Sequence, residues 1–134
     1  MITHDKLTAP DFDWQQLRQL AGEDADFEAE LLEMFLQDAE RSLRDLEQAI
    51  ARRNFQVVED IAHSLRGASA NVGASALASS ASQLEQIARK GQSNGGLTGG
   101  LTGGLTGTYA EMHELLQRIY ARCQSIRIHL QVGL

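Results

Sequence analysis

Apolar residues recur every three or four positions through the first long segment of this chain. From Asp24 onward, the repeating positions are Phe27, Leu31, Phe35, Ala39, Leu43, Leu46 and Ile50. Because an α-helix has about 3.6 residues per turn, this spacing places them on one helical face. Pro10 is the only proline and lies near the start, so no proline interrupts a later helix. The sequence therefore predicts an all-α protein.

Capping and stop signals divide most of the chain into four long helices. The first should end near Arg52 and Arg53, whose positive charges suit a helix C-terminus. Asn54 can cap the second because its side chain accepts hydrogen bonds from free backbone N–H groups. A break at Gly73 separates the second helix from the third. Two cations followed by Gly91 predict the end of the third helix, and a capping box at 108–111 predicts the start of the last.

A threefold tetrapeptide repeat, GGLTGGLTGGLTG, fills residues 95–107. Its period is too short for a solenoid unit and its glycines favour flexibility, so we interpret residues 92–107 as a flexible loop. Four amphipathic helices joined mostly by short turns predict an antiparallel up-and-down four-helix bundle over about residues 24–131. A short additional N-terminal helix is expected at about 11–20. At 134 residues the chain is expected to form a single domain, residues 1–134.

The acidic composition narrows the possible partners and location. A net charge of −6 argues against a surface for nucleic acid or for an anionic membrane. Cys123 is the only cysteine, which excludes an internal disulfide and suits a reducing compartment. We find neither a signal peptide nor an apolar run long enough to span a membrane. These features predict a cytoplasmic protein, with Cys123 in its core.

The segment AHSLRGASANVG, residues 62–73, places a histidine on a helix face with few large side chains. A helical wheel puts the apolar positions opposite His63, at Val57, Val58, Ile61, Leu65, Ala68 and Val72. The residues within about 60° of His63 on the same wheel are Asp60, Arg66, Gly67, Ala70 and Ala74. The sequence therefore predicts an exposed imidazole beside one cation and a strip of small residues.

This arrangement has a chemical interpretation. Neutral imidazole is a nucleophile at cellular pH, and an exposed ring can present one nitrogen to a phosphoryl group. Arg66, one turn further on, would disfavour the imidazolium and attract phosphoryl oxygens. Gly67 and Ala70 would let the backbone of a second protein approach closely. We therefore predict His63 as a phosphorylated nucleophile, Arg66 as the phosphoryl-stabilising residue, and docking positions at Asp60, Gly67, Ala70 and Ala74.

The motif resembles that of the histidine-containing phosphotransfer, or HPt, domain. The positions that match the family pattern are His63, Leu65, Arg66, Gly67 and Gly73, with Ala62, Ala70 and Val72 also typical. Leu84, Glu85 and the run 89–91 resemble the following helix of the family. Two departures are an arginine at 66, where lysine is commoner, and the lengthened connection that contains the repeat.

The resemblance implies a relay in multistep His-Asp signalling. His63 would take a phosphoryl group from an aspartate of one receiver domain and pass it to the aspartate of another. The expected partners are receiver domains of a hybrid histidine kinase and of a response regulator, and Mg²⁺ is expected on the receiver, with no cofactor on this chain. We expect a monomer. No nucleotide-binding motif is found, so kinase activity of its own is not expected.

Other functions remain as alternatives. His113 and Glu114 begin like the zinc motif HExxH, but Gln117 stands where the second histidine is required, so no metal site is expected. The chain could be a helical interaction bundle that does not transfer phosphate. It could also be the phosphate-accepting HPt module of a chemotaxis-type histidine kinase, although Met1 and the lack of kinase domains favour a standalone relay.

Overall fold

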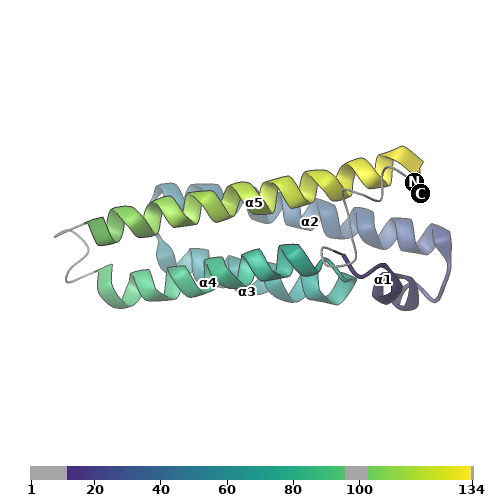
Figure 1. Ribbon diagram of the computed structural model, residues 1–134, viewed down its shortest axis with the longest axis horizontal. Coiled ribbons are helices and arrows are strands. Elements are labelled where there is room, and N and C mark those ends of the chain that lie inside the picture. The colour runs from purple at the N-terminus through teal and green to yellow at the C-terminus, as the bar shows by residue number, and fades with distance from the viewer. Residues whose placement is uncertain (1–11, 96–102, 134) are drawn as a thin grey trace.

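Five helices make up the described part of the computed structural model shown in Figure 1. The structure describes residues 12–95 and 103–133, with side chains described for 12–92 and 108–131. The helices are α1 (Trp14–Leu20), α2 (Ala25–Ala51), α3 (Phe55–Val72), α4 (Ser75–Gly95) and α5 (Gly103–Gly133). No strand occurs among these residues. The predicted all-α architecture with a short N-terminal helix is confirmed.

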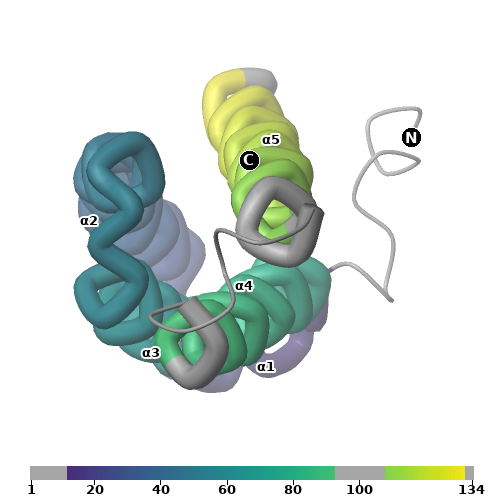
Figure 2. Tube along the Cα trace, turned by 90° about the vertical axis from the view of Figure 1, so that its left-hand side faces the viewer, coloured from purple at the N-terminus to yellow at the C-terminus, as the bar shows by residue number. Residues whose placement is uncertain are grey.

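The four long helices surround one apolar core. Helix α2 packs against α3 and α5, and α4 also packs against α3 and α5, so the four form a closed ring, seen end-on in Figure 2. Successive long helices run in opposite directions (Figure 1). The large side chains that are fully buried come from all five helices and from Phe12, two residues before α1. They include Phe12, Leu17, Leu32, Leu46, Val58, Leu77, Leu84, Met112 and Ile126. Phe27, expected on the apolar face of α2, is instead 44% exposed.

The predicted boundary between α2 and α3 is confirmed by its caps. Helix α2 ends at Ala51 with Arg52 as its C-cap. The Asn54 side chain then caps α3 by accepting a hydrogen bond from the backbone N–H of Val57. This short turn fixes the residue at which α3 begins. It thereby sets the position of each later α3 side chain along the bundle axis.

Helix α1 is fastened to the C-terminal end of α3. Gly73 follows α3 with a φ of 93°, a left-handed conformation that glycine adopts without strain. Its carbonyl accepts a hydrogen bond from the backbone N–H of Asp13 at 2.7 Å. The Gln16 amide donates to the carbonyls of Ala70 and Asn71 at 2.6 and 3.0 Å. Two of the last carbonyls of α3, those of Ala70 and Asn71, thus accept hydrogen bonds from the N-terminal segment.

The predicted ends of the last two helices are wrong. Helix α4 continues past Gly91 to Gly95. Gly91 lies within this helix, and the ring of Phe55 packs against it. A Cβ at position 91 would lie 2.7 Å from that ring, so the glycine serves packing and not helix termination. Helix α5 begins at Gly103, before the capping box. The segment 92–107 is therefore partly helical, and its part at 96–102 lies outside the described residues.

Cys123, the sole cysteine, is buried, as predicted. Burial raises the pKa of its thiol to about 12. Among the described helices, none is sufficiently long and apolar to cross a membrane.

Candidate functional site

His63 lies on α3 at the edge that faces α4, with 63% of its side chain exposed. The buried residues of α3 are Phe55, Val58, Ala62, Leu65, Ser69 and Val72. The predicted apolar face was therefore partly wrong, since Val57 is 37% exposed and Ala68 is exposed. Helix α3 packs against α4 as well as α2, which turns its buried face toward Ala62 and Ser69. His63 is exposed as predicted. It lies at the edge of the interface with α4, and not on the side of α3 directly opposite its buried face.

The nearest partner of His63 is a carboxylate on α4. Nδ1 of His63 lies 2.9 Å from Oε2 of Glu85, whose side chain is only 5% exposed. Because a carboxylate only accepts hydrogen bonds, Nδ1 must carry the hydrogen in this contact. The neutral ring then has its lone pair on Nε2, for which no hydrogen bond to a described residue is found. The site thus holds one imidazole nitrogen and leaves the other as a nucleophile.

Arg66 lies beside His63, as its spacing predicts, and it also lies beside Glu85. Its Nε is 3.4 Å from Oε1 of Glu85, and its Nη2 is 3.1 Å from Nδ1 of His63. Since Nδ1 donates to Glu85, it has no lone pair to accept from Arg66, so Arg66 is held by the carboxylate. Its side chain is 43% exposed, which leaves the guanidinium open to an incoming anion.

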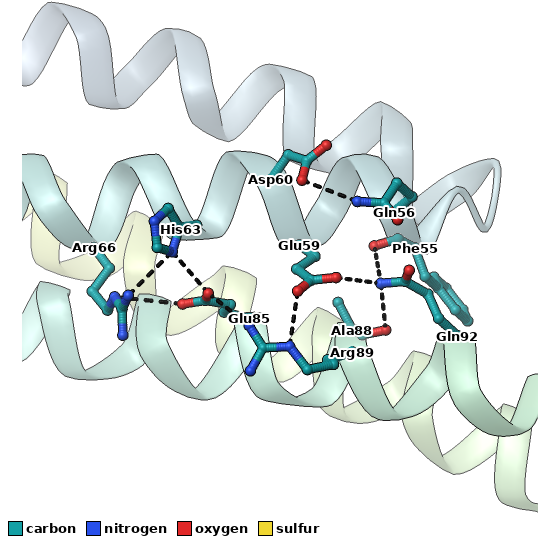
Figure 3. A network of polar contacts seen from close by, with 10 residues as sticks. All are labelled: Phe55, Gln56, Glu59, Asp60, His63, Arg66, Glu85, Ala88, Arg89 and Gln92. Carbon is teal, nitrogen blue, oxygen red and sulfur yellow. Dashed lines mark hydrogen bonds and ion pairs between the residues drawn. The ribbon is translucent and has the colours of Figure 1, made fainter.

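Further polar side chains extend from Glu85 along the interface between α3 and α4 (Figure 3). Nη2 of Arg89 donates to Oε2 of Glu85 at 3.1 Å, and Nε of Arg89 donates to Oε2 of Glu59 at 2.8 Å. Oε1 of Glu59 accepts from the Gln92 amide at 2.6 Å. Hydrogen bonds from Gln92 and then Arg89 lower the pKa of Glu59, and Glu59 in turn raises the pKa of Arg89. The guanidinium groups of Arg66 and Arg89 therefore compensate the negative charge of the nearly buried Glu85 carboxylate.

The predicted docking residues do not all share one surface. Gly67 and Ala70 are exposed on α3, and a Cβ at position 67 would meet nothing within 4 Å. Asp60 is also exposed, and its carboxylate accepts from the Gln56 amide at 3.1 Å. The prediction for Ala74 is wrong: it is 1% exposed. Helix α3 ends at Val72, so the helical wheel does not extend to residue 74.

Glu85 is the residue whose role the sequence did not reveal. It follows Leu84 of the buried face of α4 and lies 22 positions from His63, so only the packing of α4 on α3 brings the two together. A weak signal was available, because an acidic residue at the edge of an apolar stripe with an arginine four positions later is typical of a held carboxylate. No three His, Cys, Asp or Glu side chains gather as potential metal ligands among the described residues.

Comparison with known proteins places this geometry in context. Residues 30–122 match the family model described as "Hpt domain". Histidine-containing phosphotransfer protein B from Pseudomonas aeruginosa PAO1 is 28% identical, with a TM-score of 0.70, and the match covers 92% of this chain and 94% of that one. Yeast YPD1P is 16% identical, with a TM-score of 0.73 and the same coverage.

A third solved structure has a similar fold. A protein from rice, described as a putative histidine-containing phosphotransfer protein, is 22% identical with a TM-score of 0.60. The match covers 97% of this chain and 94% of the rice protein. The yeast and rice similarities, at these identities, concern the fold alone. Comparison with curated protein sequences gave no significant match.

Proposed function

Because the chain belongs to the Hpt domain family and has a histidine phosphotransfer role in phosphorelays, we propose that His63 is its phosphorylated residue. In this proposal the chain receives a phosphoryl group from an aspartate of one receiver domain and passes it to another. The observation that carries the assignment is the contact between Nδ1 of His63 and Glu85, which leaves Nε2 with its lone pair at an exposed position.

The proposed transfer step needs no proton to leave Nε2. Its lone pair attacks the phosphorus of an aspartyl phosphate, and the Nε2–P bond forms. The P–O bond to the aspartate breaks, and its electron pair stays on the aspartate carboxylate. Nδ1 keeps its hydrogen throughout, so the phosphorylated ring of His63 is positively charged and Glu85 stabilises that charge. Attack by a second aspartate reverses these bond changes and restores the neutral imidazole.

Arg66 is proposed to stabilise the phosphoryl group on His63. Its guanidinium is already beside the ring, held by Glu85, and 43% of the side chain is exposed. A cation at this position attracts the phosphoryl oxygens and lowers the free energy of the dianionic group in transfer. Mg²⁺ is expected on the receiver, as the family resemblance implies, and this chain supplies the nucleophile and the cation.

The docking surface is proposed to surround His63 on α3, at Asp60, Gly67 and Ala70. All three are exposed, and the absence of a side chain at Gly67 leaves room for a partner's backbone one turn from the imidazole. The proposed partners are receiver domains of a hybrid histidine kinase and of a response regulator. A monomer in the cytoplasm remains our prediction from the sequence.

The test is to incubate the protein with receiver domains whose aspartates carry radiolabelled phosphate. The proposal predicts that label leaves a donor receiver, appears on the chain, and then moves to a second receiver. Binding to receivers without acceptance of label would indicate an interaction bundle that does not transfer phosphate. Label acquired only from ATP and an added kinase core would indicate the phosphate-accepting module of a chemotaxis-type kinase.

A further inference from the structure

A continuous series of polar contacts leads from Gln92, near the end of α4, to the imidazole of His63 (Figure 3). The Gln92 amide donates to one oxygen of Glu59, and Arg89 donates to the other, at 2.6 and 2.8 Å. Arg89 then donates to Oε2 of Glu85, the same oxygen that accepts from Nδ1 of His63. Four contacts therefore connect the amide to the reacting ring, and three of them include a carboxylate paired with a cation or with imidazole.

Gln92 is placed to fix the orientation of the Glu59 carboxylate. Its contact with Oε1 is the shortest in this series, and it is the largest cause of the lowered pKa of Glu59. The same amide nitrogen lies 3.4 Å from the Phe55 carbonyl and 3.3 Å from the Ala88 carbonyl. Backbone groups of α3 and α4 thus hold the amide, and the amide holds one side of the carboxylate while Arg89 takes the other.

We propose that Gln92 is a positioning residue for phosphoryl transfer at His63, acting through the ion pair of Glu59 and Arg89. The proposal rests on the proposed function, because it concerns the same imidazole. The side chain of Arg89 is 59% exposed, and the carboxylates of Glu59 and Glu85 are among the groups that orient it. If Glu59 turns, Arg89 loses the geometry that holds the shared oxygen of Glu85. The ring can then carry its proton on Nε2, which removes the attacking lone pair.

The experiment compares Gln92→Ala with a matched control, Gln86→Ala. Both glutamines are exposed on α4, but the Gln86 side chain makes no hydrogen bond to a residue that the structure describes. Alanine favours a helix at either position. We expect Gln92→Ala to slow transfer from a labelled receiver about fivefold, which is typical of coupling through a contiguous network. Gln86→Ala should stay within about twofold of the unmodified protein. In ¹⁵N NMR spectra, only Gln92→Ala should lower the share of His63 that carries its hydrogen on Nδ1.

A double-mutant cycle tests whether Gln92 acts through Glu59. In a Glu59→Gln background, adding Gln92→Ala should cause no further loss of transfer. Independent effects of the two substitutions would overturn the inference, as would equal rates for the Gln92 and Gln86 variants. A loss of transfer accompanied by a loss of helical content would assign Gln92 a structural role and also overturn it. Failure of the unmodified protein to accept phosphate would contradict the proposed function instead.

Discussion

A substitution at Gly67 tests receiver docking separately from the chemistry of His63, because a side chain at position 67 is compatible with the fold. A Cβ at this position would meet nothing within 4 Å, and the residue lies in the middle of α3. Glycine costs up to about 1 kcal/mol more than a good helix former in a helix interior. Gly67→Gln should therefore raise the free energy of unfolding by up to that amount. For a domain of this size the melting temperature should rise by up to about 4 °C.

The same substitution should block a receiver. A glutamine at 67 projects from the exposed side of α3, one turn from His63, into the space that a docked partner would occupy. We expect transfer from a phosphorylated receiver to fall at least about tenfold, which corresponds to about 1.4 kcal/mol of lost transition-state stabilisation. A small donor such as phosphoramidate should still label His63 at the unmodified rate. The assay follows labelled phosphate with each donor in turn.

Two other glycines provide controls for the predicted gain in stability, because an added Cβ at either of them would clash with a neighbour. A Cβ at Gly91 would lie 2.7 Å from the Phe55 ring, so Gly91→Ala should destabilise the fold by about 1–3 kcal/mol. Gly73 combines a φ of 93° with a Cβ position 2.5 Å from the Asp13 carbonyl, so Gly73→Ala should also destabilise. If Gly67→Gln impairs both donors equally, position 67 shapes the imidazole and the argument is refuted. If it impairs neither, the docking surface lies elsewhere.

Three further results are expected. Arg66→Ala should slow transfer and shorten the life of phosphohistidine about tenfold, whereas Arg66→Lys should largely restore both, because a point charge suffices beside the phosphoryl oxygens; equal losses in the two variants would refute this. Burial raises the pKa of the Cys123 thiol to about 12, so iodoacetamide at pH 8 should leave this thiol unmodified in the native protein. The thiol should react once guanidinium unfolds the chain, and mass spectrometry would detect the added mass. Alkylation of native protein at the rate of a free thiol would contradict its burial. Deleting residues 99–102, one unit of the repeat, should leave transfer rates within about twofold, because loop-closure entropy changes by less than about 1 kcal/mol; a large loss with the fold intact would place the repeat in the partner site.

The sequence predicted what depends on local spacing. Helical periodicity located the bundle, and the turn from Arg52 to Asn54 was recognised because one cap ends α2 and another starts α3. Arg66 was correctly placed beside His63, since residues three apart on a helix are neighbours. These relations need no knowledge of how the helices pack.

Relations between helices were not predictable in the same way. The contact of His63 with Glu85 arises from the packing of α3 on α4. Gly91 has two possible meanings in a sequence, helix end or close packing, and only the position of the Phe55 ring decides between them. Ala74 was misplaced because the helical wheel was extended past the break predicted at Gly73. Tertiary contacts, which periodicity does not encode, settle the cases of Glu85 and Gly91.

The most direct test of the account is to locate the phosphate on the protein after transfer from a receiver. Phosphopeptide mapping combined with ¹⁵N and ³¹P NMR identifies both the histidine and the ring nitrogen. The account predicts one acid-labile, alkali-stable phosphate on Nε2 of His63, and no label in His63→Gln. Label on His4, His113 or His129, or phosphate on Nδ1 of His63, would contradict the proposed roles of His63 and Glu85.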